Sequence, residues 1–126
     1  MSHRPISSAE GLAAVARVRQ ALSTLPETEE RIDKFGHTTF RVRNKPIVFL
    51  GEDGQGCWFS VKADRHTQAF LLRRECFEKT PYIGQHGWTS VRWDRIPDWD
   101  EIVELIREAY LLVAPARLKK EMTDIE

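Results

Sequence analysis

Cysteine is scarce in this chain, and its scarcity excludes a disulfide-stabilised domain. Only Cys57 and Cys76 occur among 126 residues, and the sequence contains no Cys-x-x-Cys pair or clustered Cys/His pattern. Small disulfide frameworks need several closely spaced cysteines, and structural zinc sites need paired ligands. We therefore predict two free thiols that are buried or slow to react.

Long hydrophobic runs and an excess of one charge are also missing. The longest apolar run near the middle of the chain is Ile47–Leu50, far short of the roughly 20 residues that span a bilayer. The first 11 residues lack the order of a secretory signal, so we expect a cytoplasmic protein with no membrane partner. Lys plus Arg and Asp plus Glu number 19 each, which excludes a strongly basic nucleic-acid arm.

What the chain does contain is the composition of a single globular domain. Hydrophobic residues make up 41% and charged residues 30%, and four Trp and six Phe supply aromatic bulk for one core. The length suits one domain, which we place over residues 1–126 with its core at about 8–120. The sequence shows no internal repeat and no low-complexity segment.

Apolar residues at helical spacing predict three helices. The first begins near the N-cap candidate Ser8 and ends before Pro26, burying Val15, Val18, Leu22 and Leu25. A short helix follows Asp64, with Phe70 and either Leu71 or Leu72 directed inward. The clearest helix opens at Pro97-Asp98, and Pro115 either ends it or restarts the chain as a short basic turn.

Alternation of apolar and polar residues predicts strands at about 29–34 (with Ile32 inward), 37–43, 47–50, 57–62 and 88–93. Loops separate them at 51–56 and 80–87. Together with the helices, this order favours an α+β domain of two layers, an antiparallel sheet with helices on one face and solvent on the other. The predicted core comprises Phe40, Phe49, Phe59, Val61, Val91, Ile102, Ile106 and Val113.

The open face of this sheet collects basic and aromatic side chains. The period of two places Arg41, Arg43, Lys62 and Arg92 there, together with Trp58 and Trp88, because the opposite assignment would bury the basic groups. Exposed aromatics among basic groups are typical of platforms for single-stranded nucleic acid. The alternative is that the basic residues only keep the face solvated and prevent edge pairing, while the tryptophans pack under loops.

Catalytic and metal-binding patterns do not emerge. None of the four histidines stands at metal-ligand spacing, and His86, in the loop before Trp88, is the histidine best placed for a binding site. A nucleophile pair of Cys57 with His86 competes with a buried structural thiol, which we favour. Carboxylates at residues 98–101 suit the first turn of a helix. We predict no catalytic residue, no metal and no cofactor.

Several segments carry a family resemblance. Residues 81–92 (PYIGQHGWTSVR), residues 35–42 (FGHTTFRV) followed by Lys45, and the end of the last predicted helix around residues 109–117 resemble the MmcQ/YjbR family, small bacterial proteins with a CyaY-like fold. The resemblance covers roughly residues 8–120. Ala109 stands where the family often has Ser, and Asn44 where Gly is common.

The resemblance implies DNA binding, since the family is named as DNA-binding on the basis of two hairpins read as a double wing. The wings would be the hairpin at residues 43–45 and the loop at residues 84–87. With the open face, they define a candidate set for binding DNA or single-stranded nucleic acid: Arg41, Arg43, Lys45, Trp58, Lys62, His86, Trp88 and Arg92. The alternative is a module for a small ligand or a protein partner on the same tryptophans. The iron binding of CyaY-type proteins does not carry over, because the first helix has only Glu10 for an acidic ridge.

Overall fold

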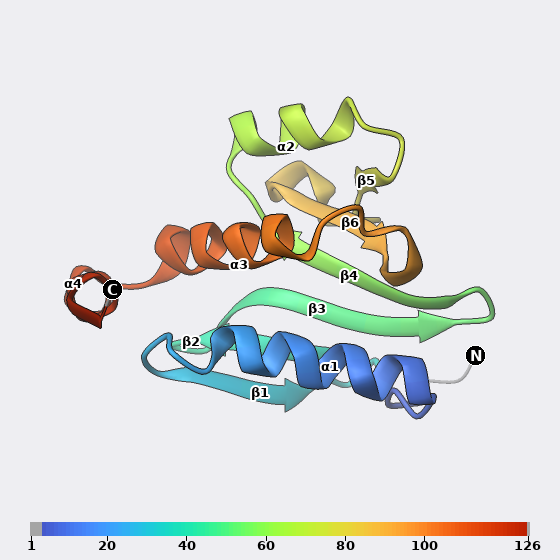
Figure 1. The fold of residues 1–126 in the computed structure, drawn as a ribbon, viewed down its shortest axis with the longest axis horizontal. Coiled ribbons are helices and arrows are strands. Elements are labelled where there is room, and N and C mark those ends of the chain that lie inside the picture. The colour runs from blue at the N-terminus through green and yellow to red at the C-terminus, as the bar shows by residue number, and fades with distance from the viewer. Residues whose placement is uncertain (1–3, 126) are drawn as a thin grey trace.

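The protein is built on a six-stranded sheet, seen here in a computed structural model that describes residues 4–125 (Figure 1). All pairings are antiparallel, in the order β1-β2-β3-β4-β6-β5. The strands are β1 (Thr28–Ile32), β2 (Thr38–Val42), β3 (Lys45–Asp53), β4 (Gly56–Lys62), β5 (Phe77–Lys79) and β6 (Trp88–Arg92). The predicted α+β class is confirmed. The short β5 was not predicted, and β3 extends into the segment expected to be a loop.

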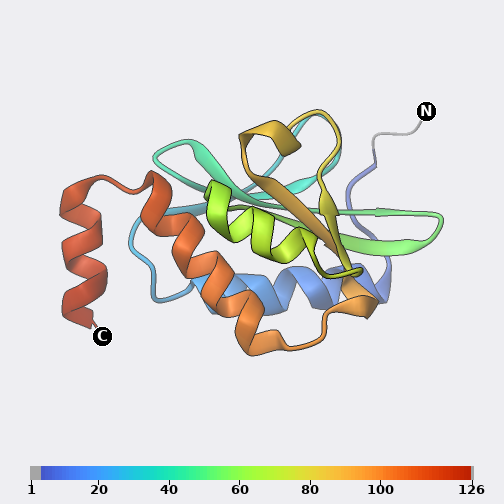
Figure 2. The same ribbon diagram turned by 90° about the horizontal axis from the view of Figure 1, so that it is seen from above.

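The longer helices α1 (Ala9–Leu22) and α3 (Trp99–Val113) cover one face of the sheet, while the segment around the 3₁₀ turn η1 (Gly84–His86) lies over the other (Figure 2). α2 (Arg65–Leu72) packs beside β5 and β6, and a second 3₁₀ turn, η2 (Trp93–Arg95), precedes α3. The chain restarts after Pro115, but as the 10-residue helix α4 (Ala116–Ile125) rather than a short turn, and this helix stands apart from the sheet (Figure 2).

Side chains cap the helices where the sequence predicted. Ser8 Oγ accepts from the backbone N–H of Gly11 at 2.9 Å, and Asp64 Oδ1 accepts from that of Thr67 at 2.7 Å. Asp98 caps α3 through the N–H of Asp100. Each cap satisfies a donor that the first helical turn leaves without an intrahelical partner.

The core lies between the sheet and the pair α1 and α3. The predicted core residues Phe40, Phe59, Val61, Val91, Ile102 and Ile106 are at most 2% exposed, and Val113 packs against them while partly buried. The prediction that Phe49 belongs to the core is wrong, because the residue is only half-buried and lies on the opposite face of the sheet. The reason is that Val48 and Leu50 point toward the helices, so the residue between them points away. A register shift opposite Phe40 and Arg41 places Ile47 in the core next to Val48.

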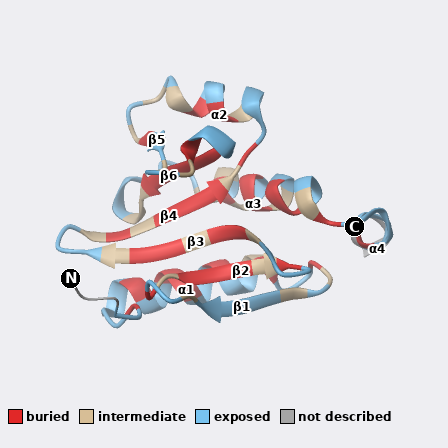
Figure 3. Cartoon of the chain, turned by 180° about the vertical axis from the view of Figure 1, so that it is seen from behind, coloured by how far each residue is buried: buried red, intermediate tan, exposed pale blue. Residues whose placement is uncertain are grey.

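Two further inward assignments are wrong. Ile32 is 58% exposed because β1 is the edge strand, where neighbours cover a side chain from one side only (Figure 3). Phe70 is 59% exposed, while Leu71 alone supplies the apolar contact of α2 to the core. The predicted free thiols are confirmed. Burial raises the pKa of Cys57 to about 11, and the nearby negative charge of Glu10 is the second-largest cause of this increase. Within residues 4–125, no helix is long and apolar enough to cross a membrane.

Candidate binding groove on the open sheet face

The open face of the sheet is hollowed into a groove lined largely by aromatic rings. Its main hollow, which we call the aromatic hollow, encloses about 720 Å³, within the range of small-molecule sites. The floor comes from β2, β3 and β4, one wall from the β1–β2 turn and the other from the segment after β5. The lining residues are Asp33, Lys34, Phe35, His37, Arg41, Phe49, Trp58, Thr80, Pro81, Tyr82 and Ile83.

Aromatic rings on three neighbouring strands form the floor and its support. Trp58 on β4 is half-buried, and Phe49 on β3 packs on Trp88 of β6 with ring centroids 4.8 Å apart. A Cβ atom added to Gly51 would lie 2.4 Å from Cζ2 of Trp58, so the absence of a side chain at Gly51 lets the indole lie over β3. The Trp58 ring therefore lies directly against the backbone of β3 at Gly51.

The first wall is the turn between β1 and β2, and Asp33 organises it. Its Oδ1 atom accepts from the backbone N–H groups of Phe35 at 2.8 Å and His37 at 3.0 Å. Its Oδ2 atom lies 3.5 Å from Nδ1 of His37. The His37 ring stands edge-on to Trp58, with centroids 5.0 Å apart. Phe35 is half-exposed at the rim, so the wall offers aromatic surface to a ligand.

The second wall carries the most exposed aromatic residue named in the groove. Tyr82 is 97% exposed and has a left-handed backbone conformation, with φ 68°. The chain just after it is fixed, because Nε2 of the buried Gln68 donates to the carbonyls of Gly84 at 2.9 Å and Trp88 at 3.1 Å. The Gly84–His86 turn is thus tied to α2, within the connection between the paired strands β5 and β6.

Two of the arginines expected on the open face are paired with carboxylates. Arg92 donates to Asp53 through Nη1 at 3.0 Å and Nη2 at 2.8 Å, and this pair lowers the pKa of Asp53. Arg43 lies 3.1 Å from Glu27. Arg41 differs, since its guanidinium donates to the hydroxyl of Thr39 and to the backbone carbonyl of Asn44 and has no carboxylate partner among the described residues.

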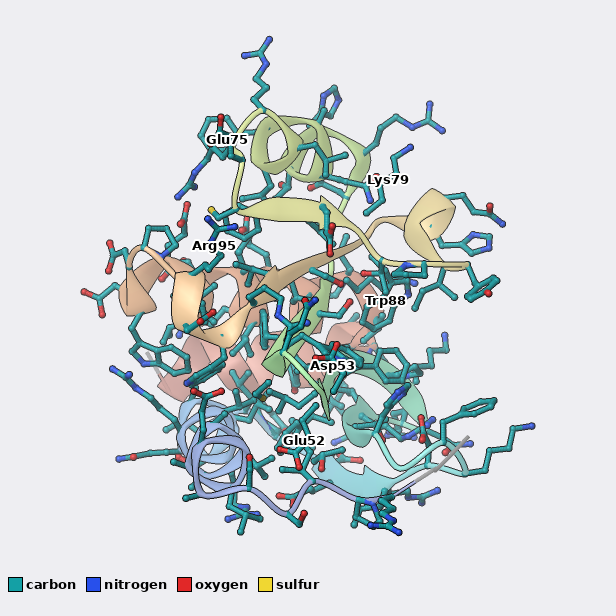
Figure 4. The ribbon with its side chains drawn as sticks, turned by 90° about the vertical axis from the view of Figure 1, so that its right-hand side faces the viewer. Glu52, Asp53, Glu75, Lys79, Trp88 and Arg95 are labelled. Atoms are coloured by element: carbon teal, nitrogen blue, oxygen red, sulfur yellow. The ribbon has the colours of Figure 1, made fainter. Side chains whose placement is uncertain are left out.

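The predicted site residues do not form one site but lie at several separate places on the molecule. Arg41 and Trp58 line the aromatic hollow, and Arg92 lines its continuation. Trp88 faces the same way, on the side of the strands away from α1 (Figure 4), but is only 5% exposed, so the expectation that it is exposed is wrong. The remaining residues lie elsewhere: Lys62 and His86 line a separate hollow beside α2, and Arg43 and Lys45 belong to the β2–β3 hairpin.

The β2–β3 hairpin is the first of the two predicted wings. Arg43 and Asn44 both have positive φ, at 51° and 67°, the conformation of a type I′ turn. Asn44 tolerates it better than most residues other than glycine, which accounts for its place where the resembling family often has Gly. Its Oδ1 accepts from Arg31 at 3.2 Å, tying the turn to the edge strand.

Several residues of the groove were not predicted as site residues. Phe49 was assigned to the core, and Phe35, His37 and Tyr82 received no role. The Phe49 signal was available, because Val48 and Leu50 flank it with a period of two. The position of Tyr82 depends on a loop that folds over the sheet, which periodicity does not describe. Among the described residues, no cluster of three or more His, Cys, Asp or Glu side chains could hold a metal ion.

Comparison with known proteins places this fold in a family. The YjbR family model matches residues 23–112, which is most of the chain. A crystal structure of Deinococcus radiodurans protein DR2400, with the domain DUF419, superposes with a TM-score of 0.71 at 20% identity, covering 86% of this chain and 87% of that one. No curated protein matches. The chain therefore belongs to the YjbR family, and the MmcQ/YjbR resemblance is confirmed.

Proposed function

We propose that this YjbR-family protein binds a planar aromatic ring that carries an anionic group, which is the chemistry of a nucleotide, either free or within a single strand. The observation that supports it best is the aromatic hollow, where rings from the floor and both walls surround a space of about 720 Å³. Stacking between such rings and a base contributes about 1–3 kcal/mol per base. The rim position of Tyr82 provides a further ring that a base could meet.

The charges of the hollow suit a ligand with few phosphates. Arg41 and Lys34 are its cations, and Asp33 is its one carboxylate. Arg92 and Arg43 are already paired with carboxylates, so the extended basic track that duplex DNA would need is absent from the described groove. We infer one or two phosphate contacts, made chiefly by Arg41.

Binding without catalysis is part of the proposal. The hydroxyls beside the hollow bond to one another: Ser60 Oγ lies 2.6 Å from Thr80 Oγ1, which lies 2.7 Å from Ser90 Oγ. None of these hydroxyls has a histidine as hydrogen-bond partner among the described residues, so no activated nucleophile is assembled there.

Fluorescence titration tests this function directly. Trp58 lines the hollow, so a bound base should quench part of the tryptophan emission, and labelled single strands should gain anisotropy. With about two phosphate contacts, log K for a single strand should fall with log salt at a slope of about −1.4 between about 50 and 200 mM. Trp58→Ala should weaken binding about 5- to 150-fold with the slope unchanged, because stacking releases few ions.

Arg41→Gln should instead make that slope shallower by about 0.7. Arg73→Gln is its matched control, an exposed arginine at the C-terminal end of α2 that does not line the aromatic hollow. Phe70→Ala is the control for loss of an exposed aromatic ring. Absence of quenching and anisotropy change at the lowest salt, with folded protein at high micromolar concentration, would overturn the proposal.

A free small ligand is the second candidate, favoured by the confined size and near-neutral lining of the hollow. Mononucleotides separate the two sources. If a mononucleotide binds as tightly as an oligonucleotide of the same base, the natural ligand is small. If affinity rises with strand length, the single strand is the ligand.

A further inference from the structure

The groove continues past Trp58 into a second hollow of about 230 Å³. We call it the polar hollow; its lining comprises Asp53, Trp58, Glu78, Thr80, Pro81, Ser90, Val91 and Arg92. It shares Trp58, Thr80 and Pro81 with the aromatic hollow, so one ligand can occupy both. By itself it is smaller than ordinary small-molecule sites, which makes it a subsite of the same groove.

The charge of the polar hollow disfavours a phosphate. Its single cation, Arg92, is held by Asp53 through two hydrogen bonds. Glu78, exposed on β5, adds a second carboxylate, and it has no ion-pair partner among the described residues. A phosphate placed here would meet a net negative lining, whereas a neutral hydroxyl would meet acceptors.

Hydroxyl chemistry completes this lining. Ser90 and Thr80 are bonded to each other at 2.7 Å, and Thr80 also bonds to Ser60. A hydroxyl oxygen has two acceptor lone pairs and one donor hydrogen, so Ser90 retains capacity beyond its bond to Thr80. The hollow therefore offers a carboxylate acceptor and a hydroxyl within one small space, near Asp53 at the end of β3, with β4 between β3 and β6 (Figure 4).

We infer that the polar hollow takes the sugar of the nucleotide whose base occupies the aromatic hollow, and that it selects ribose over deoxyribose. The 2′-hydroxyl is both donor and acceptor and is the group by which proteins distinguish RNA from DNA. It donates to the carboxylate of Glu78 and accepts from Ser90, and the phosphate remains at Arg41. This inference rests on the proposed nucleotide binding and specifies its ligand as RNA-type.

Matched homopolymers of adenine, one of ribonucleotides and one of deoxyribonucleotides, test the inference by anisotropy at one salt concentration. The ribose strand should bind about tenfold more tightly or more, the fold-change that corresponds to one hydrogen bond to a charged group. Glu78→Ala should remove most of this preference while retaining affinity for the deoxyribose strand. Glu75→Ala, an exposed carboxylate outside the groove, should leave the preference unchanged.

The outcomes separate this inference from the proposed function. If both strands bind equally to the wild type, the ribose preference is wrong and nucleotide binding stands. If ribose is preferred but Glu78→Ala leaves the preference intact, the assignment to the polar hollow is wrong. If neither strand binds, the proposed function fails and the inference fails with it.

Discussion

The two faces of this sheet are made by the same strands but differ in how far their side chains are buried. Toward α1 and α3, aliphatic side chains and Phe59 are almost completely buried. On the other face, Phe49 and Trp58 are half-buried and surround a hollow. Alternation supplies apolar groups to both faces, and the difference lies in the cover: helices close one face, whereas a turn and a loop only border the other. Aromatic surface that is bordered but not closed is available to a ligand.

The same contrast separates two tryptophans on the open face. Trp58 and Trp88 are both directed away from α1, and Trp88 lies next to Lys62 in the pairing of β4 with β6. Trp88 is closed over and packs on Phe49, while Trp58 forms part of the groove floor. One supports the site and the other forms it, although their sequence patterns are alike.

The largest effect should come from removing the supporting tryptophan. Trp88→Ala should lower the free energy of unfolding by about 3–5 kcal/mol, because the ring is 5% exposed and its loss leaves a cavity. Trp58→Ala should lower it by less, since that residue is only partly buried. Urea unfolding followed by circular dichroism measures both. Equal losses would contradict the distinction between a supporting and a ligand-facing tryptophan.

A truncation under the helices should have a similar but slightly smaller effect. Ile106→Ala in α3 should cost about 2–5 kcal/mol, since Ile106 is fully buried between helix and sheet. Leu111→Ala, on the exposed side of the same helix at 38% exposure, is the control and should change stability by about 0.5 kcal/mol or less. Ligand affinity per folded molecule should be unchanged in both. An unchanged melting temperature for Ile106→Ala would show that α3 buries a different stripe.

The covered face could be predicted well from the sequence. Helical spacing located the buried stripe of α3, and period-two alternation located Phe59, Val61 and Val91, because apolar burial obeys a local geometric rule. The incorrect assignments occur where burial also depends on the position of the strand within the sheet. Ile32 follows the alternation but lies on an edge strand. The sequence of a single strand does not indicate where that strand lies in the sheet.

The open face could be predicted only in outline. Alternation correctly directed Arg41, Trp58 and Arg92 outward, but whether an arginine is paired with a carboxylate depends on residues far away in the chain. Arg92 is neutralised by Asp53, which is 39 residues distant. The groove itself requires the loop after β5 to fold back over β4, a placement that arises from Gln68 and from Gly87 packing on the backbone of Ala63. No local pattern carries that information.

A substitution beneath the groove floor should have an intermediate effect. Gly51→Ala places a Cβ atom 2.4 Å from the Trp58 ring, so the indole must move, and overpacking of this kind costs about 1–3 kcal/mol. Quenching by a bound nucleotide should fall in parallel. Gly54→Ala is a matched control, because a Cβ atom there meets nothing within 4 Å. If Gly51→Ala preserves both stability and quenching, the position of Trp58 is not fixed by β3.

The smallest effect should come from the ion pair that borders the polar hollow. Arg92 holds the pKa of Asp53 below its ordinary value, so the pair stabilises the fold above the unfolded pKa of about 3.9 and loses that contribution as pH falls through the lower folded value. Because the Asp53 side chain is 50% exposed, we expect at most about 1 kcal/mol. The wild type should exceed Asp53→Asn in stability near pH 6, and the gap should close toward about pH 3.

Asp53→Asn also frees Arg92 for a phosphate, so it should steepen the salt dependence of single-strand binding by about 0.7. An exposed-carboxylate control, Glu75→Gln, should not steepen it. A salt slope unchanged by Asp53→Asn would show that Arg92 is out of reach of the bound phosphates.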